Sequence, residues 1–187
     1  MRRPDPDVYV AELRREFPQL RVISKGEDPL SRAIDAALRV LTFGGQSAYM
    51  TRYVTTLGQT IYVPADWHAR PARERYCVLR HEAVHLRQFR RFGWLGMSFL
   101  YLLPLLPLGL AWGRARLEWQ AYAETFRAHA EVYGVEAARG PGLRAHVRSQ
   151  FTGPAYGWMW PFAAQVDRWI DEVLEGLEAP RTSGPVV

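Results

Sequence analysis

Residues 92–113 carry no charged side chain, and this long apolar stretch restricts the folds that the sequence can adopt. A helix of this length is long enough to cross a lipid bilayer. Trp94 and Trp112 stand near its two ends, and arginines flank it, as in the interfacial belts of membrane proteins. The stretch must therefore be buried in a core, be exposed as a contact surface, or enter a membrane.

A second feature immediately precedes this stretch: residues 81–85 read HEAVH, within a helix predicted over 71–92. On a helix, positions i and i+4 lie one above the other, so His81 and His85 can hold one metal ion from one face. Glu82 is rotated by about 100° from His81, which places it beside the metal rather than on it. That is the position of a general base that acts on a metal-bound water.

A catalytic zinc site has three protein ligands and a water, so a third ligand is required. Glu118, in the segment E-W-Q-A-Y, follows His85 by about 33 residues and is the candidate. In this respect the sequence resembles the gluzincin metallopeptidases, over roughly residues 71–124. Those enzymes pair HExxH with a glutamate on a later helix, often as E-x-x-A-D. The resemblance implies that zinc is held by His81, His85 and Glu118.

Tyr122 occupies the position where such families commonly have an aspartate that orients the first histidine. A tyrosine offers a hydroxyl but no negative charge at neutral pH, so the support of His81 is the point where this sequence departs from the pattern. Glu124 is the rival ligand. It lies about 240° around the helix from Glu118, so the two glutamates cannot both face the metal.

The metal site and the apolar stretch constrain each other. A straight membrane crossing by residues 94–112 would put His85 and Glu118 about 30 Å apart and would destroy the site. We therefore expect Pro104 and Pro107 to break the stretch into a hairpin of two short helices that turns back. The hairpin is either buried or exposed as a surface for a membrane or a protein partner.

Local signals predict the remaining elements. Asp5 and Pro6 place an N-cap and a first-turn proline before a helix that ends near Phe17. Residues 20–24 suit a short strand, and residues 48–63 suit a β-hairpin that turns at 57–59. Further helices are expected at 30–41, 114–133 and 143–151, and a last helix whose apolar face is formed by Val166, Trp169, Ile170, Val173, Leu174 and Leu177.

These elements predict an α+β fold, a mostly helical zincin-like domain with a small antiparallel sheet beside the HExxH helix. One domain is expected over residues 1–179, with a loose tail at 180–187. In zincins the peptide substrate commonly pairs with a sheet edge, and the resemblance suggests the strand Thr60–Val63 for that role.

Several other residues have a functional and a structural interpretation. Gln88, one turn after His85, could support that ligand or be an ordinary polar residue. Cys77 is expected to be a buried structural thiol. Tyr156 is a candidate donor to the oxyanion of peptide hydrolysis, although its loop could equally be a packing plug. A stripe of arginines on the HExxH helix is expected to face solvent, and it comprises Arg73, Arg80, Arg87 and Arg91.

Composition narrows the classes of function. The net charge of +5 permits weak attraction to anions, but no basic block with interleaved aromatic residues indicates a nucleic-acid surface. Cys77 is the only cysteine, which excludes an internal disulfide, and the N-terminus lacks the apolar core of a secretory signal. We expect a cytoplasmic protein that could associate with a membrane, and nucleic acid is an unlikely partner.

The sequence thus predicts a zinc-dependent peptidase with Zn²⁺ as cofactor and a peptide or protein as substrate. Glu82 would take a proton from the zinc-bound water and pass it to the leaving amine. Two alternatives are a membrane-associated metallopeptidase that uses the 94–112 hairpin, and a non-catalytic metal-binding or interaction protein. Another divalent metal is also compatible with the residues.

Overall fold

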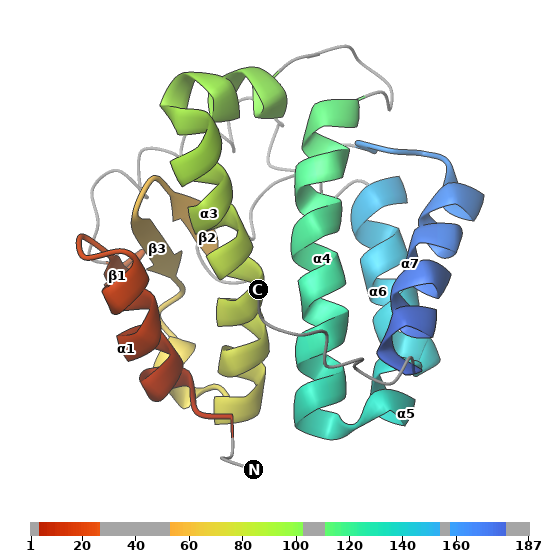
Figure 1. Cartoon of the computed structure of the whole chain (residues 1–187), viewed down its shortest axis with the longest axis horizontal. Coiled ribbons are helices and arrows are strands. Elements are labelled where there is room, and N and C mark those ends of the chain that lie inside the picture. Colours follow the sequence, from red (N-terminus) through yellow and green to blue (C-terminus); the bar gives the residue numbers. More distant parts are fainter. Residues whose placement is uncertain (1–3, 27–52, 103–110, 154–157, 179–187) are drawn as a thin grey trace, which may run out of the picture.

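The computed structural model describes residues 4–26, 53–102, 111–153 and 158–178 (Figure 1). Several predicted features lie wholly or partly outside these ranges. They are the helix at 30–41, the first part of the hairpin, the prolines 104 and 107, the loop with Tyr156 and the tail at 180–187. The described chain is mostly helical with one small three-stranded sheet, which confirms the α+β class. Its elements are α1 (Pro6–Glu16), β1 (Arg21–Ser24), β2 (Thr55–Leu57), β3 (Thr60–Val63), the 3₁₀ helix η1 (Trp67–Ala69), α3 (Ala72–Leu102), α4 (Trp112–Tyr133), α5 (Val135–Ala138), α6 (Pro141–Thr152) and α7 (Ala163–Glu178).

Helix α1 begins as the sequence predicts. The Asp5 carboxylate accepts hydrogen bonds from the backbone N–H groups of Asp7 and Val8, at 2.8 and 3.1 Å, and Pro6 occupies the first turn. These contacts satisfy N–H groups that have no partner within the helix. The helix packs its Leu13 and the following Phe17 against β3 and α3, in a core cluster that α1 shares with the sheet.

The sheet has the strand order β1-β3-β2, with β1 parallel and β2 antiparallel to β3. The hairpin β2–β3 is confirmed, and Gly58 at its turn has a φ of 60°, which favours glycine. The expectation that Thr60–Val63 is the edge strand is wrong, because β1 and β2 already pair with both of its edges. Within the described residues β2 is the strand at the edge nearest the HExxH motif, and Thr56 contacts Glu82.

Lys25 closes the end of this sheet. It is completely buried, and its ammonium donates hydrogen bonds to the Tyr53 carbonyl oxygen at 2.9 Å and to the Thr55 hydroxyl at 3.0 Å. A buried ammonium is costly unless its protons find partners, so these contacts hold the start of β2 near the end of β1. The position of Thr56 therefore depends on Lys25.

Two core clusters lie on either side of the α3–α4 pair (Figure 1). The first cluster joins α1, the sheet and the first part of α3. The second joins α4 to α7 and includes Phe126, Phe151, Trp169 and Ile170. The predicted apolar face of α7 is confirmed, since Val166, Trp169, Ile170 and Leu174 are buried there. Helices α3 and α4 run side by side in opposite directions between the clusters, and their contact creates the candidate site.

Helix α3 is interrupted at Gly93, where φ is 64° and ψ is 179°. This break agrees with the helix predicted over 71–92, whereas the break expected at Pro104 and Pro107 lies outside the described residues. The break at Gly93 separates the HExxH portion from a short distal segment, residues 94–102, which bends away at the end of the molecule where α4 begins (Figure 1). Among the described residues no helix is long and apolar enough to cross a membrane.

We expect Gly93→Ala to destabilise the protein although a methyl group there would contact nothing within 4 Å. The cost arises from a backbone conformation that L-residues avoid, and about 1–2 kcal/mol of unfolding free energy should be lost. Gly176→Ala is the matched control, because that glycine is exposed within α7 and also has open space. It should gain roughly 0.5–1 kcal/mol from its higher helix propensity. Denaturant unfolding measures both changes, and an unaltered midpoint for Gly93→Ala would contradict the strain.

Candidate metal centre

The burial of one face of α3 determines where the face with the two histidines points. Leu79, Ala83 and Leu86 recur at helical spacing and are buried against α1 and the sheet. His81 and His85 lie on the opposite face, which is turned toward α4. The hydrophobic effect on one side of the helix thus aims both imidazoles at the neighbouring helix.

Three ligand atoms from the two helices converge. The Nε2 atoms of His81 and His85 are 3.2 Å apart, and each lies 3.9 Å from Oε2 of Glu118. A point equidistant from these three atoms is about 2.1 Å from each, which matches the length of zinc–nitrogen and zinc–oxygen bonds. Among the described residues this is the one group of three such side chains that could hold a metal ion.

A hydrogen bond sets the proton of His81. The Thr125 hydroxyl donates to the Ala121 carbonyl oxygen at 3.2 Å, so its oxygen accepts from Nδ1–H of His81 at 3.0 Å. The Nε2 atom then carries the lone pair that faces the site. Burial, together with the neighbouring His85, holds the pKa of His81 well below its ordinary value, and the ring stays neutral, as a metal ligand must be.

Gln88 performs the same task for His85. Its amide nitrogen donates to the Leu117 carbonyl oxygen and to the side chain of Gln120, both at 3.0 Å. Its amide oxygen therefore accepts from Nδ1–H of His85 at 2.8 Å. The supporting role considered for Gln88 is confirmed, and the lone pair of His85 also points at the site.

Glu118 is the third member of the group and is almost fully buried, with 2% of its surface exposed. Its Oε1 accepts a hydrogen bond from the Tyr101 hydroxyl, whereas its buried Oε2 has no hydrogen-bond partner in the described part of the chain. A buried carboxylate oxygen without a donor is costly. Two imidazole lone pairs and this oxygen form a donor set that a divalent cation would satisfy, so the residues fit a zinc ion.

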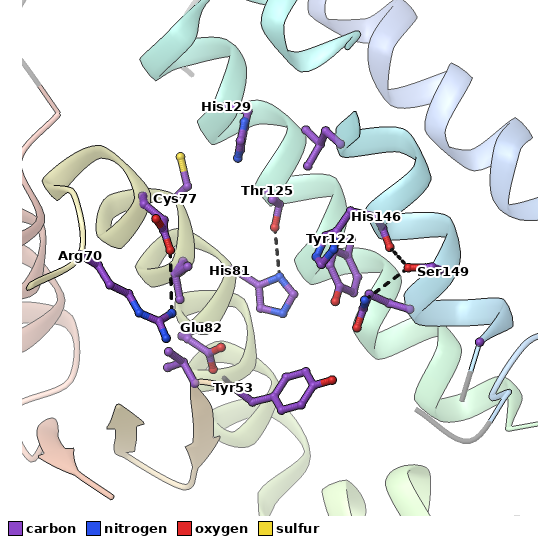
Figure 2. A pocket seen from close by; sticks show the side chains of 16 residues that line it. Tyr53, Arg70, Cys77, His81, Glu82, Tyr122, Thr125, His129, His146 and Ser149 are labelled. Atoms are coloured by element: carbon purple, nitrogen blue, oxygen red, sulfur yellow. Dashed lines mark hydrogen bonds and ion pairs between the residues drawn. The ribbon is translucent and has the colours of Figure 1, made fainter. Parts of the chain in front are cut away.

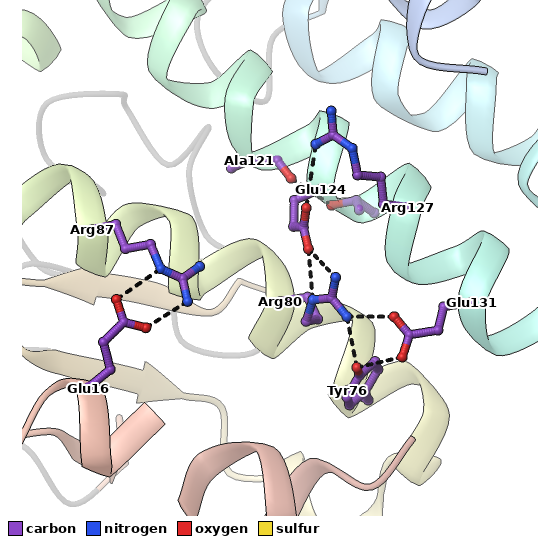
Figure 3. A network of polar contacts seen from close by, with 9 residues as sticks. Glu16, Tyr76, Arg80, Arg87, Ala121, Glu124, Arg127 and Glu131 are labelled. Atoms are coloured by element: carbon purple, nitrogen blue, oxygen red, sulfur yellow. Dashed lines mark hydrogen bonds and ion pairs between the residues drawn. The ribbon is translucent and has the colours of Figure 1, made fainter. Parts of the chain in front are cut away.

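Glu124, the rival ligand, belongs to a different contact (Figure 3). The Arg80 guanidinium donates to Glu124 through Nε at 2.7 Å and through Nη2, and it donates to Glu131 and Tyr76 through Nη1 at 2.6 and 2.8 Å. This network ties α3 to α4 beside the site and engages the Glu124 carboxylate. The expectation that Arg80 faces solvent is therefore wrong. Arg87 is exposed, as expected, and pairs with Glu16 of α1.

Glu82 lies next to the two histidines without joining their contact. It is 5% exposed, and its Oε2 accepts a hydrogen bond from the Thr56 hydroxyl of β2 at 2.7 Å. Burial raises the pKa of this carboxyl above its usual range, while His85 and the Thr56 hydrogen bond act in the opposite direction. A higher pKa makes the carboxylate a stronger base, which suits proton transfer near neutral pH.

A cleft of about 610 Å³ opens beside His81 and Glu82 (Figure 2). Its walls come from α3, α4, α6 and the residues that lead into β2. The cleft is lined by Tyr53, Val54, Arg70, Glu74, Cys77, Val78, His81, Glu82, Tyr122, Thr125, His129, Leu143, His146, Ser149, Gln150 and Gly153. This volume is typical of a ligand site, and both His81 and Glu82 line the cleft.

Two further expectations have clear outcomes. Tyr122 is buried with its ring edge-on to His81 at a centroid distance of 4.8 Å, so it packs against the ligand while Thr125 supplies the hydrogen bond. Cys77 is buried, and burial raises its pKa to about 12, which keeps it a neutral thiol as expected. Tyr156 lies outside the described residues, and its role stays a prediction.

Sequence reasoning missed Tyr101 and Thr56 as supporting residues, and it placed Thr125 on the face of Glu118 without assigning it a hydrogen bond. Thr125 had a usable signal, because it shares a helix face with Glu118. Tyr101 is the one residue with a ring hydroxyl within the apolar stretch at 94–112, which was a weaker signal. Thr56 had none, because its contact with Glu82 depends on how the sheet packs on α3.

No protein-family model matches this chain, and neither curated proteins nor solved structures gave a match. The resemblance to gluzincins therefore depends on the HExxH motif and Glu118. The structure adds that these residues, which are far apart in the sequence, come together as a group able to hold a metal ion.

We expect Glu118→Ala to lose bound zinc and Glu124→Ala to keep it. Removal of Glu118 takes away one of three ligands, whereas Glu124 contacts arginine. Zinc per chain, measured by elemental mass spectrometry after dialysis against a weak chelator, separates the two variants. Loss of zinc from Glu124→Ala alone would show that the ligand assignment is wrong.

Tyr101→Phe should weaken zinc binding by roughly 10–100-fold, the usual effect of removing a group that orients a ligand. The ring is retained, so the change isolates the hydroxyl that donates to Glu118. Tyr133→Phe, an exposed tyrosine near the far end of α4, is the matched control. Competition with a chromophoric chelator gives both dissociation constants, and equal values would contradict a role for the Tyr101 hydroxyl.

Proposed function

We propose that this protein is a zinc-dependent metallohydrolase, and specifically a peptidase. The observation that carries the proposal is the convergence of the Nε2 atoms of His81 and His85 on the buried Oε2 of Glu118, which has no hydrogen-bond donor among the described residues. The carboxylate of Glu82 lies beside this group. A purely structural zinc site is closed by four protein ligands, whereas three ligands leave a position for water or substrate. The described residues supply three such ligands, and this donor set therefore favours a catalytic site over a structural one.

Zinc in this position would act as a Lewis acid and make water acidic enough to serve as a nucleophile near neutral pH. Glu82 is the group that would accept the proton of that water and return it to the leaving nitrogen. Thr56 holds the Glu82 carboxylate by donating to Oε2, which leaves Oε1 to act on the water. The raised pKa of Glu82 lets one carboxylate serve as base and then as acid.

The cleft supports a peptide as the substrate. Tyr53 and Val54 line it just before β2, so an extended chain could lie along this side of the sheet and reach Glu82. Backbone pairing of this kind binds peptides with little dependence on their side chains. We therefore place the substrate beside residues 53–57 rather than beside Thr60–Val63, whose two edges are already paired.

The test begins with zinc content. Wild type should hold about one zinc per chain, and His81→Ala/His85→Ala should hold none, because two of three ligands are gone. No zinc in wild type, even after zinc is added, would overturn the proposal of a metal centre.

Glu82→Gln then tests catalysis separately from binding. The amide keeps the size of the side chain but cannot accept the proton, so zinc should remain while hydrolysis falls by roughly 10²–10⁴-fold. Cleavage of a mixed quenched-fluorescent peptide library measures the rate, with Glu172→Gln, an exposed residue of α7, as the control that keeps full activity. Zinc binding without any Glu82-dependent cleavage would indicate a metal-binding protein that is not a peptidase.

A further inference from the structure

The distal segment of α3, residues 94–102, exposes large apolar side chains on its outer face. Met97 is 3% exposed and Tyr101 contacts Glu118, so one face of this short helix packs on the metal centre. Leu95 and Phe99, which lie on the opposite face, are 88% and 63% exposed. Large apolar side chains at adjacent turns are thus presented to the outside of the molecule.

Two tryptophans extend this surface. Trp94 packs on Phe89 and over the turn at Gly58, yet 60% of it remains exposed. Trp112 is also 60% exposed, and it lies in the first turn of α4, which packs on the distal segment where Gly113 meets Leu100. We call the surface formed by Trp94, Leu95, Phe99 and Trp112 the apolar patch. Figure 1 shows the end of α3 and the start of α4 together at one end of the molecule.

The segment that carries the patch has formal charges of one sign only. Residues 83–117 contain no aspartate or glutamate, and they contain five arginines, at positions 87, 90, 91, 114 and 116. Arg87 and Arg90 pair with Glu16 of α1, while Arg91 and Arg116 are exposed. Arg91 precedes Trp94 by three residues, and Arg116 follows Trp112 by one helical turn, so these two exposed arginines add positive charge beside the patch.

We propose that the apolar patch docks on the surface of an anionic lipid bilayer. Tryptophan, leucine and phenylalanine suit the boundary between headgroups and acyl chains, and arginines beside them are attracted to anionic headgroups. A stable protein interface needs roughly 20–30 residues on each side, and four apolar side chains fall well short of that. A short helix that lies on the membrane requires no span, which agrees with the helices described here. This proposal is independent of the proposed peptidase activity.

The test is co-flotation of the zinc-loaded protein with vesicles of phosphatidylcholine, with and without phosphatidylglycerol. We expect binding to the anionic vesicles that weakens as salt rises, with a blue shift of tryptophan fluorescence. Leu95→Ser/Phe99→Ser should reduce the partition coefficient at least roughly tenfold, because two apolar side chains no longer enter the lipid. Val8→Ser changes an apolar residue of α1 that is 40% exposed and lies outside the patch, and it should change nothing.

A second pair of substitutions tests the charges. Arg91→Gln and Arg116→Gln should each weaken anionic binding by roughly fivefold and flatten its salt dependence. Unaltered zinc content in every variant shows that the metal centre survives, so failure here leaves the proposed enzyme untouched. Absence of vesicle binding by wild type overturns the proposal. If wild type is then a dimer that Leu95→Ser/Phe99→Ser dissociates, the patch binds a second copy of the chain instead of a membrane. Equal binding to neutral vesicles would overturn the part assigned to the arginines.

Discussion

The Nε2 atoms of His81 and His85 lie 3.2 Å apart, and the buried Oε2 of Glu118 faces both of them. With the protons on Nδ1, as the hydrogen bonds of Thr125 and Gln88 indicate, two lone pairs face each other and repel. Elements on both sides of the site maintain this unfavourable arrangement. Thr125 and Gln88 fix the protons of His81 and His85 on the outer nitrogens, and Tyr101 holds Glu118. The Nδ1 atoms of both histidines and Oε1 of Glu118 thus have hydrogen-bond partners, whereas the two Nε2 atoms and Oε2 face one another. A cation bound between these three atoms would satisfy them.

The packing of α3 against α4 brings the ligands together, and polar contacts secure the two helices on either side of the site. Gln88 reaches the Leu117 carbonyl oxygen, one residue before Glu118, and Arg80 reaches Glu124 and Glu131. The apolar core clusters lie on the far sides of the two helices. One packs α3 against α1 and the sheet, and the other packs α4 against α5 to α7. Each core cluster therefore holds one of the two helices in a position where its candidate ligands face the other helix.

The distal segment of α3 connects the inside of the protein with its surface. Its inner face carries Tyr101 and its outer face carries Leu95 and Phe99, and a single glycine with positive φ sets its direction. The long uncharged stretch that first suggested a membrane span is, at its start, a short helix whose Tyr101 contacts Glu118 of the candidate metal centre. Of its apolar side chains, Met97 is buried in the protein, whereas Leu95 and Phe99 are exposed on the surface.

The sequence by itself determined the local features: the cap of α1, the β2–β3 hairpin, the apolar face of α7 and the shared helix face of His81 and His85. These follow from backbone hydrogen bonding and side-chain periodicity within one segment. The choice between Glu118 and Glu124, the support of His81 by Thr125 instead of Tyr122, and the central place of β3 were decided by tertiary structure. Helix phase excludes two glutamates from facing one metal, but it does not say which face meets α3. That depends on how helices distant in the sequence pack, and here Arg80 engages Glu124 while burial leaves Glu118 beside the histidines.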